Sequence, residues 1–316
     1  MSGETEILEL LQKIKGNIGR VIVGKEKVVD MVLIGLICGG HILIEDVPGL
    51  GKTTLVSALA RTLACDFRRI QFTPDVLPSD VTGFTSFNLK TGEREVNFGG
   101  VMAQIVLADE INRASPKTQS SLLEVMQEGQ VTIDGVSYPV PQPFMVLATQ
   151  NPVEHVGTYP LPEAQLDRFL LKISVGYPQR DEELAILLRN KTANPLEALE
   201  PVATAEDILL LRKKHSEITC AKPVMEYIVS IAEATRKHDK ISLGVSPRGS
   251  LALMHAAMAN AMLNGRSYTM PDDVQAMAES VLYHRLLINF QQNQKMETPA
   301  SLLYTILRTI RVPGVS

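Results

Sequence analysis

The pattern of apolar and polar positions along the chain predicts two parts with different secondary structure. Up to about residue 178, short apolar runs alternate with amphipathic stretches, which is typical of β-strands alternating with α-helices. Beyond that point the apolar residues recur at helical spacing, from QRDEELAILLRN to TPASLLYTILRTIRV. The pattern predicts an α/β part over residues 1–178 and a smaller all-helical part over residues 179–316.

Two of the predicted elements flank a glycine-containing loop. The run HILIE (41–45) is typical of a buried strand, and KTTLVSALARTLA (52–64) has apolar residues at helical spacing. This order of strand, loop, Lys-Thr and helix is the context that a phosphate-binding loop requires. The loop N–H groups would face phosphate oxygens. Lys52 would reach the β- and γ-phosphates, and the Thr53 hydroxyl would bind Mg²⁺.

The loop departs from the usual phosphate-binding pattern at its first position, where Asp46 replaces glycine. From this stretch alone, a chance Gly-Lys-Thr on an ordinary connection stays open as an alternative. Because a carboxylate close to phosphate is electrostatically unfavourable, we expect the side chain of Asp46 to point away from a bound nucleotide.

Two later apolar runs end in polar residues that suit phosphoryl transfer. AQIVLADE ends in Asp109 and Glu110, and PFMVLATQN ends in Asn151. Asp109 would hold magnesium through water, and Glu110 would polarise the attacking water. Asn151 could touch the γ-phosphate or that water. The glycine loop, strand and helix that precede them count against a chance match as the explanation of the whole order.

Two arginines farther along are candidates for contact with phosphate. Arg168 falls on a short helix predicted within residues 161–175, and an arginine at such a rim can neutralise transition-state charge, often from a neighbouring subunit. Arg248 falls in the first turn of a helix that Ser246 would cap and Pro247 would begin. From that position Arg248 could reach a bound anion.

Composition narrows the class of protein. The chain has 316 residues and a formal net charge of −4, and the densest basic stretch is RKKH, so general nucleic-acid binding is not expected. Three well-separated cysteines indicate thiols in a reducing compartment. Asp30 and Gly39-Gly40 interrupt the most apolar run, which falls short of a membrane span, and the start has no signal-peptide core. We therefore expect a cytoplasmic protein without a transmembrane segment.

The chain resembles MoxR-type ATPases of the AAA+ superfamily, within the group that carries a helix-2 insert. The stretches that carry the resemblance cover nearly the whole chain: EDVPGLGKTT, QFTPDVLPSDVTG, LADEINRASPKTQSSLLEVMQEGQVTIDG, ATQNP, LPEAQLDRF and SPRG. The resemblance implies an α/β P-loop AAA+ core with a parallel five-stranded sheet and a helical lid. It also implies a homo-oligomeric ring, expected to be hexameric, that hydrolyses ATP with Mg²⁺.

The resemblance assigns roles residue by residue. In order along the chain, the matches are Lys52 and Thr53 to Walker A, Asp109 and Glu110 to Walker B, Asn151 to sensor 1, Arg168 to the arginine finger and Arg248 to sensor 2. The expected nucleotide-binding residues are Val23, Gly24, Gly49, Leu50, Gly51, Lys52, Thr53, Thr54, Asp109 and Arg248. Thr53 and Asp109 would hold the Mg²⁺. Gln71 could hold Glu110 idle, and Arg113 could face a neighbouring subunit or form a surface ion pair.

Two β-hairpins are predicted in the first part. One spans residues 83–100 with its turn at Thr91-Gly92, and we expect Val96 and Phe98 to point inward. The other spans residues 129–140 with its turn at Asp134-Gly135. The first falls where the helix-2 insert belongs and the second where related proteins carry a hairpin before sensor 1. Both could simply cover the sheet edge, or they could move with the nucleotide state and touch a partner.

The resemblance implies a chaperone-like role, in which a protein complex is remodelled or matured together with a von Willebrand factor A-domain partner. A nucleic-acid motor or loader remains an alternative, because helicase subunits share the helix-2 insert; the acidic composition counts against it. A nucleotide-binding scaffold that hydrolyses little is a third possibility. The intact Asp109-Glu110 pair and Arg168 count against that one.

Overall fold

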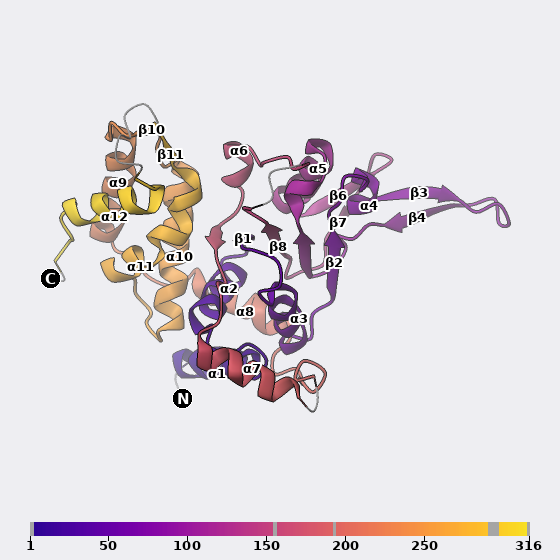
Figure 1. The fold of residues 1–316 in the computed structure, drawn as a ribbon, viewed down its shortest axis with the longest axis horizontal. Helices are drawn as coiled ribbons and strands as arrows, with labels where there is room; N and C mark the ends of the chain where they lie inside the picture. Colours follow the sequence, from indigo (N-terminus) through magenta and orange to yellow (C-terminus); the bar gives the residue numbers. More distant parts are fainter. Residues whose placement is uncertain (1–2, 154–156, 192–193, 290–296, 315–316) are drawn as a thin grey trace.

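A five-stranded parallel sheet lies at the centre of the first part of the chain (Figure 1). The computed structural model describes residues 3–153, 157–191, 194–289 and 297–314. The strand order is β2-β5-β8-β1-β9. The strands are β1 (Ile42–Glu45), β2 (Phe67–Gln71), β5 (Ile105–Asp109), β8 (Met145–Gln150) and β9 (Leu171–Ile173). The parallel five-stranded sheet expected from the sequence is therefore confirmed.

The apolar side chains of the strands point alternately to the two faces of the sheet, as the period of an extended chain requires. Ile42 and Ile44 belong to one buried cluster, and Leu43 belongs to the other. The first cluster contains residues of α1 (Gly3–Gly19), α2 (Glu26–Ile37) and α3 (Lys52–Thr62). The second contains residues of α4 (Pro78–Thr82) and α5 (Pro116–Glu128). With both faces covered, the strands can be almost wholly apolar.

The sequence signals for helix ends correspond to observed ends. The Ser115 side chain accepts a hydrogen bond from the backbone N–H of Thr118 at the start of α5, and Gly129 ends that helix. A short 3-10 helix, η1 (Ile111–Arg113), joins β5 to α5. Because η1 is so short, α5 starts close to the carboxyl end of β5.

Both predicted hairpins are present. The pair β6 (Gln130–Ile133) and β7 (Val136–Pro139) is joined at Asp134-Gly135, and the pair β3 (Gly83–Phe87) and β4 (Arg94–Phe98) projects from the body of the molecule (Figure 1).

The expectation that Val96 and Phe98 point inward is wrong. Their exposed fractions are 38% and 44%. Among the residues that the structure describes, no layer covers the projecting part of the β3–β4 hairpin (Figure 1). Its base approaches the second hairpin, where the rings of Phe98 and Tyr138 meet edge to face at 5.2 Å.

The second part of the chain consists mainly of helices. After α6 (Glu163–Leu166) follow α7 (Arg180–Asn190), α8 (Ala205–His215), α9 (Lys222–Lys237), α10 (Pro247–Leu263), α11 (Pro271–Leu282), the 3-10 helix η2 (Tyr283–Arg285) and α12 (Pro299–Thr309). It is not purely helical, because β10 (Ile241–Leu243) pairs antiparallel with β11 (Leu287–Ile288). Within the described ranges, no helix has the length and apolar character that crossing a membrane requires.

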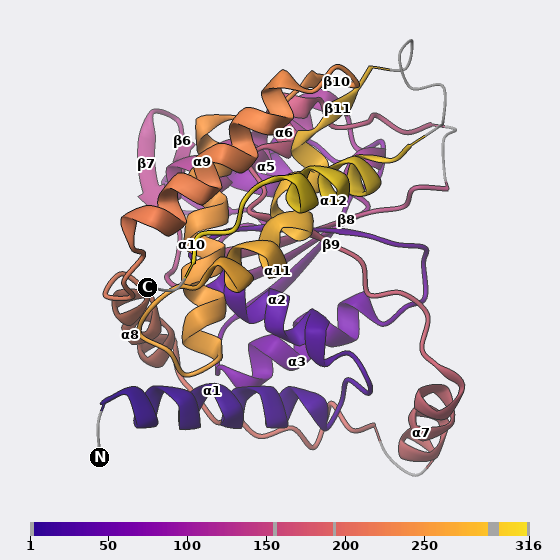
Figure 2. The same cartoon turned by 90° about the vertical axis from the view of Figure 1, so that its left-hand side faces the viewer.

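The helices of this second part do not form one isolated bundle. Helix α7 stands apart from α9–α12, while α8 packs against α2 of the first part (Figure 2). Buried residues of α8 to α12 belong to the same apolar cluster as those of α1 to α3. The two parts of the chain are thus joined by continuous packing on one side of the sheet.

Candidate active site

The loop between β1 and α3 has a backbone that requires glycine at two positions. Gly49 and Gly51 have φ values of 87° and 79°, in the left-handed region that side chains with a Cβ rarely adopt. Helix α3 begins directly after Gly51, at Lys52. The free N–H groups at the start of α3 and those of the loop therefore face the same space, which is the arrangement of an anion-binding loop.

Asp46, the unusual first residue of the loop, is turned toward β9. Its carboxylate accepts hydrogen bonds from the Ser174 hydroxyl (2.7 Å) and from the backbone N–H groups of Val175 and Gly176. The side chain is buried. The expectation that this carboxylate turns away from the phosphate side is confirmed, and Asp46 instead ties the loop to the chain that follows β9.

Replacing Asp46 with alanine should lower the free energy of unfolding by about 1–3 kcal/mol, because buried N–H groups lose their acceptor. Urea denaturation measures this change. Asp46→Asn keeps one acceptor oxygen, so we expect a smaller loss for that matched variant. An alanine variant as stable as the parent protein would show that these hydrogen bonds do not hold the loop.

A polar cavity of about 380 Å³ opens where the loop meets the carboxyl ends of the strands. Its lining residues are Pro48, Gly49, Gly51, Lys52, Thr53, Thr54, Arg69, Asp109, Glu110 and Asn151. Lys52 Nζ donates to the backbone carbonyl oxygens of Asp46 (2.8 Å) and Val47 (3.3 Å). Burial lowers the pKa of Lys52, and the carboxylates of Asp46, Asp109 and Glu110 oppose that shift. A partly desolvated ammonium group beside loop N–H groups suits a phosphate ligand.

Asp109 and Glu110 occupy the end of β5, and Thr149 of the neighbouring β8 holds both. The Thr149 hydroxyl donates to Asp109 Oδ1 (2.6 Å) and accepts from the backbone N–H of Glu110 (2.8 Å). Glu110 has φ = 58°, a left-handed conformation that is uncommon for a residue with a side chain. Such strained residues concentrate at functional sites. Here the turn directs the Glu110 side chain into the polar cavity.

Two donors hold the carboxylate of Glu110. Gln71 Nε2 lies 3.2 Å and Arg113 Nη1 lies 3.1 Å from Glu110 Oε2. The contact expected between Gln71 and Glu110 is present, and Arg113 makes an ion pair within its own chain. Asn151 lines the same cavity, and its Oδ1 accepts from the backbone N–H of Val153.

A second, more apolar cavity of about 560 Å³ adjoins the polar one, with which it shares Gly49, Gly51 and Thr54. Val23 and Leu50 line it, together with residues of the segment 186–196. Gly24 lies between the lining residues Val23 and Lys25 in the chain and packs against the side chain of Glu182 on α7. An apolar cavity joined to a polar, phosphate-sized one suits a ligand with an aromatic base and a phosphate chain.

The structure does not place the two candidate arginines at the polar cavity. Arg168 lies in the turn after α6 rather than on a helix, and its Nη1 donates to the Leu123 carbonyl oxygen (2.9 Å). Arg248 lies in the first turn of α10, after Ser246 and Pro247, as the sequence predicts. Arg168 and Arg248 line a different cavity of about 250 Å³, together with Arg285. Arg248 therefore lines a cavity other than the polar one of its own chain, and its contact with a bound anion stays a prediction.

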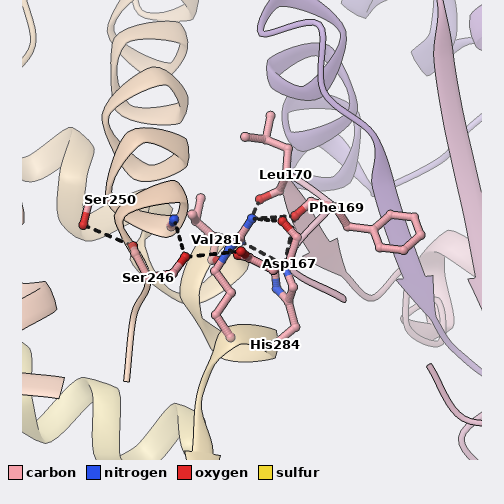
Figure 3. Close-up of polar contacts among 9 residues, drawn as sticks. Asp167, Phe169, Leu170, Ser246, Ser250, Val281 and His284 are labelled. Carbon is pink, nitrogen blue, oxygen red and sulfur yellow. Dashed lines mark hydrogen bonds and ion pairs between the residues drawn. The ribbon is translucent and has the colours of Figure 1, made fainter. Parts of the chain in front are cut away.

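The reason for this placement is a polar contact between the start of α10 and the segment around Arg168. The Ser246 hydroxyl donates to Asp167 Oδ2 (3.2 Å), as Figure 3 shows. Arg285, whose side chain is only 3% exposed, donates to Asp167 Oδ1 (2.7 Å) and to the carbonyl oxygen of Phe169 (2.7 Å). These contacts fix the two arginines on one surface, away from the loop.

Sequence comparisons place the chain in a known family. A family profile described as "ATPase family associated with various cellular activities (AAA)" matches residues 41–171, and one described as "AAA lid domain" matches residues 233–306. Chaperone MoxR1 of Mycobacterium tuberculosis is 41% identical over 94% of this chain and 81% of its own length. The chain belongs to the MoxR family of AAA+ ATPases.

Two more comparisons support membership of the MoxR family. The uncharacterised protein YeaC of Bacillus subtilis is 49% identical over 99% of this chain and 98% of its own. A solved Cytophaga hutchinsonii protein, provisionally named an ATPase, superposes with a TM-score of 0.91 at 38% identity. That superposition covers 98% of this chain and 97% of the other.

In this MoxR-family chain, the fold gathers most of the candidate residues around the two adjoining cavities. Arg168 and Arg248 are the exceptions. Sequence reasoning missed Thr149 and Arg69. Thr149 is the first polar residue after the apolar run MVLA of its strand, whereas Arg69 is one of two adjacent arginines in FRRIQ. Thr149 and Arg69 could not be assigned to the site from sequence, because only the strand order β2-β5-β8 shows that both adjoin Asp109.

Proposed function

We propose that this protein hydrolyses ATP to ADP and phosphate. The observation that supports the proposal is the convergence of Lys52, Thr53, Asp109, Glu110 and Asn151 on one polar cavity beside an apolar one. The adenine would occupy the apolar cavity near Val23, and the phosphates would lie against the loop N–H groups and Lys52. Glu110 would accept a proton from the attacking water, which Asn151 would help to orient.

The residues present also fit the magnesium ion that such ATPases use. The Thr53 hydroxyl and the Asp109 carboxylate line the same cavity, and hydroxyl and carboxylate oxygens are ligands that Mg²⁺ prefers. Thr53 would hold the ion directly, and Asp109 would hold it through water. When bound with ATP, the ion neutralises charge that develops on the phosphate oxygens.

We propose that neighbouring subunits complete the site in a ring, with hexamer as the expected assembly. Arg168 and Arg248 lie around a cavity of their own, at a distance from the phosphate loop in the fold. Two guanidinium groups on one surface match the negative charge of a neighbour's γ-phosphate. Arg285 would keep the pair aligned, since it anchors the segment that carries Arg168.

If subunits complete one another's sites, turnover per subunit should rise with protein concentration until the ring has formed. Steady-state ATP hydrolysis across a dilution series, with light scattering on the same samples, measures both quantities. A dilute monomer that hydrolyses ATP at the full rate would contradict the shared site.

We propose that ATP binding and hydrolysis drive rotation between two parts of the chain, residues 1–178 and 179–316. The apolar cavity supports this division, because Val23 and Leu50 of the first part line it together with Ile186, Asn190 and Leu196 of the second. A nucleotide held in that cavity would touch both parts. Its hydrolysis would then change their relative position.

The work that we propose for this motion is chaperone-like remodelling or maturation of a protein complex in the cytoplasm, with a von Willebrand factor A-domain protein as partner. Support comes from a relative that is named a chaperone and from the projecting β3–β4 hairpin, where Phe84, Phe87 and Leu89 are exposed. A nucleic-acid motor is the alternative. The net charge of −4 does not favour it, and stimulation of the ATPase by DNA would.

A further inference from the structure

Arg69, on β2, contacts Asp109, the carboxylate of the polar cavity that we propose holds the metal. Its Nε and Nη2 atoms lie 3.1 Å and 2.6 Å from the same oxygen, Asp109 Oδ2. The other oxygen, Oδ1, accepts the hydrogen bond from Thr149. Both oxygens of Asp109 therefore already have a donor, and one of the two donors carries a full positive charge.

The same guanidinium group reaches Glu110 through Gln71. Arg69 Nη2 lies 2.5 Å from Gln71 Oε1, and Gln71 Nε2 lies 3.2 Å from Glu110 Oε2. A guanidinium group can only donate, so the amide oxygen of Gln71 must face Arg69 and its amide nitrogen must face Glu110. Arg69 thus neutralises one carboxylate and orients the amide that holds the other.

The exposures of the two partners indicate which one can move. The Asp109 side chain is 13% exposed and is fixed by Thr149, whereas the Arg69 side chain is 47% exposed. The Arg69 side chain can rotate into solvent without creating a void in the protein interior, while Asp109 stays in place. Because a divalent cation and a guanidinium group repel each other, the two cannot both approach Asp109 closely.

We propose that Arg69 is a tethered cation that keeps Asp109 closed to metal until a metal–nucleotide complex displaces it, and that its departure frees the Gln71 amide to leave Glu110. This inference rests on the proposed function, since it concerns the regulation of the same site. It makes Arg69 a positioning residue. Divalent metal alone binds poorly, and the contact of Gln71 with Glu110 is released only when both metal and phosphate are in the cavity.

Binding of Mn²⁺ to the nucleotide-free protein, followed by the electron paramagnetic resonance signal of the free ion, tests the proposal without any turnover. Arg69→Ala should bind Mn²⁺ more tightly than the parent protein by on the order of tenfold, because a competing positive charge is removed. Arg69→Lys keeps the positive charge and should bind Mn²⁺ nearly as weakly as the parent protein. That result would show that the tighter binding in Arg69→Ala comes from the lost charge and not from a fold defect.

Arg68→Ala is the matched control, since Arg68 is the adjacent exposed arginine and donates to the carbonyl oxygen of Gly99 instead. It should leave Mn²⁺ affinity unchanged. Equal Mn²⁺ affinity in Arg69→Ala and the parent would overturn the proposal, as would an equal gain in Arg68→Ala. Failure of the proposed ATPase function can be told apart from failure of the Arg69 proposal. In that case the parent protein would hydrolyse no ATP, whatever the Mn²⁺ affinities of the variants.

Discussion

Arg168→Ala should lower ATP turnover by about 10³-fold or more, as the loss of an arginine finger does. ATP affinity should stay close to that of the parent protein. The reason is positional: Arg168 lines the cavity that it shares with Arg248, and the phosphate cavity is lined by other residues. On the proposed shared site, its loss would remove charge from a neighbour's transition state and leave its own loop unchanged. Steady-state kinetics and titration with a fluorescent ATP analogue give the two quantities.

A matched control for this variant is Arg308→Ala. Arg308 is an exposed arginine on α12 that stacks on Tyr304. We expect turnover in that variant to equal that of the parent protein. Loss of ATP binding in Arg168→Ala would contradict the account, because it would place Arg168 at the nucleotide of its own subunit. Unchanged turnover would contradict it as well.

Glu110→Gln should lower turnover by about 10²- to 10⁴-fold, the contribution that a general base commonly makes, and should leave ATP bound. Glutamine matches glutamate in size and can take the same strained backbone conformation. The amide of Gln71 and the guanidinium of Arg113, which now meet Glu110 Oε2, would face a neutral oxygen instead. Rapid chemical quench measures hydrolysis, and retention of radiolabelled ATP on a filter measures binding.

The stalled Glu110→Gln protein also tests the proposed partner. Capture from the native cell with Mg–ATP, against an ADP control, should retain a von Willebrand factor A-domain protein only with ATP. DNA or replication proteins in the ATP sample would favour the nucleic-acid motor. Shortening the β3–β4 or β6–β7 hairpin in the same variant should spare ATP binding and abolish capture. Capture that survives both deletions would show that the hairpins only cover the sheet edge.

Much of this site could be predicted from sequence because its parts are local. The phosphate loop depends on Gly49, Gly51 and the following Lys52, which are adjacent in the chain and need only a strand before them and a helix after them. Asp109 and Glu110 likewise end a recognisable apolar run. The residues of each such pattern are neighbours in the chain and determine the local structure by themselves, so a single sequence predicts it.

The remainder depends on contacts between distant segments. Arg69 and Thr149 meet Asp109 only because β2 and β8 flank β5, and no local pattern contains that order. The place of Arg248 depends on how α10 docks against Asp167, through Ser246 and the buried Arg285. Sequence predicts the helix and its cap but not the surface that the helix meets. The inward orientation predicted for Val96 and Phe98 is wrong for the same reason, because sequence does not show which element would cover them.

The central claim, that each ATP site is completed by the neighbouring subunit, is tested most directly by mixing two inactive variants. Lys52→Ala lacks a working phosphate loop and keeps Arg168, whereas Arg168→Ala keeps the loop. In an equimolar mixture with random assembly, about a quarter of the interfaces in a head-to-tail ring would combine an intact loop with an intact arginine. The account predicts that mixing restores hydrolysis to about that share of the parent rate. A mixture no more active than its two components would contradict it.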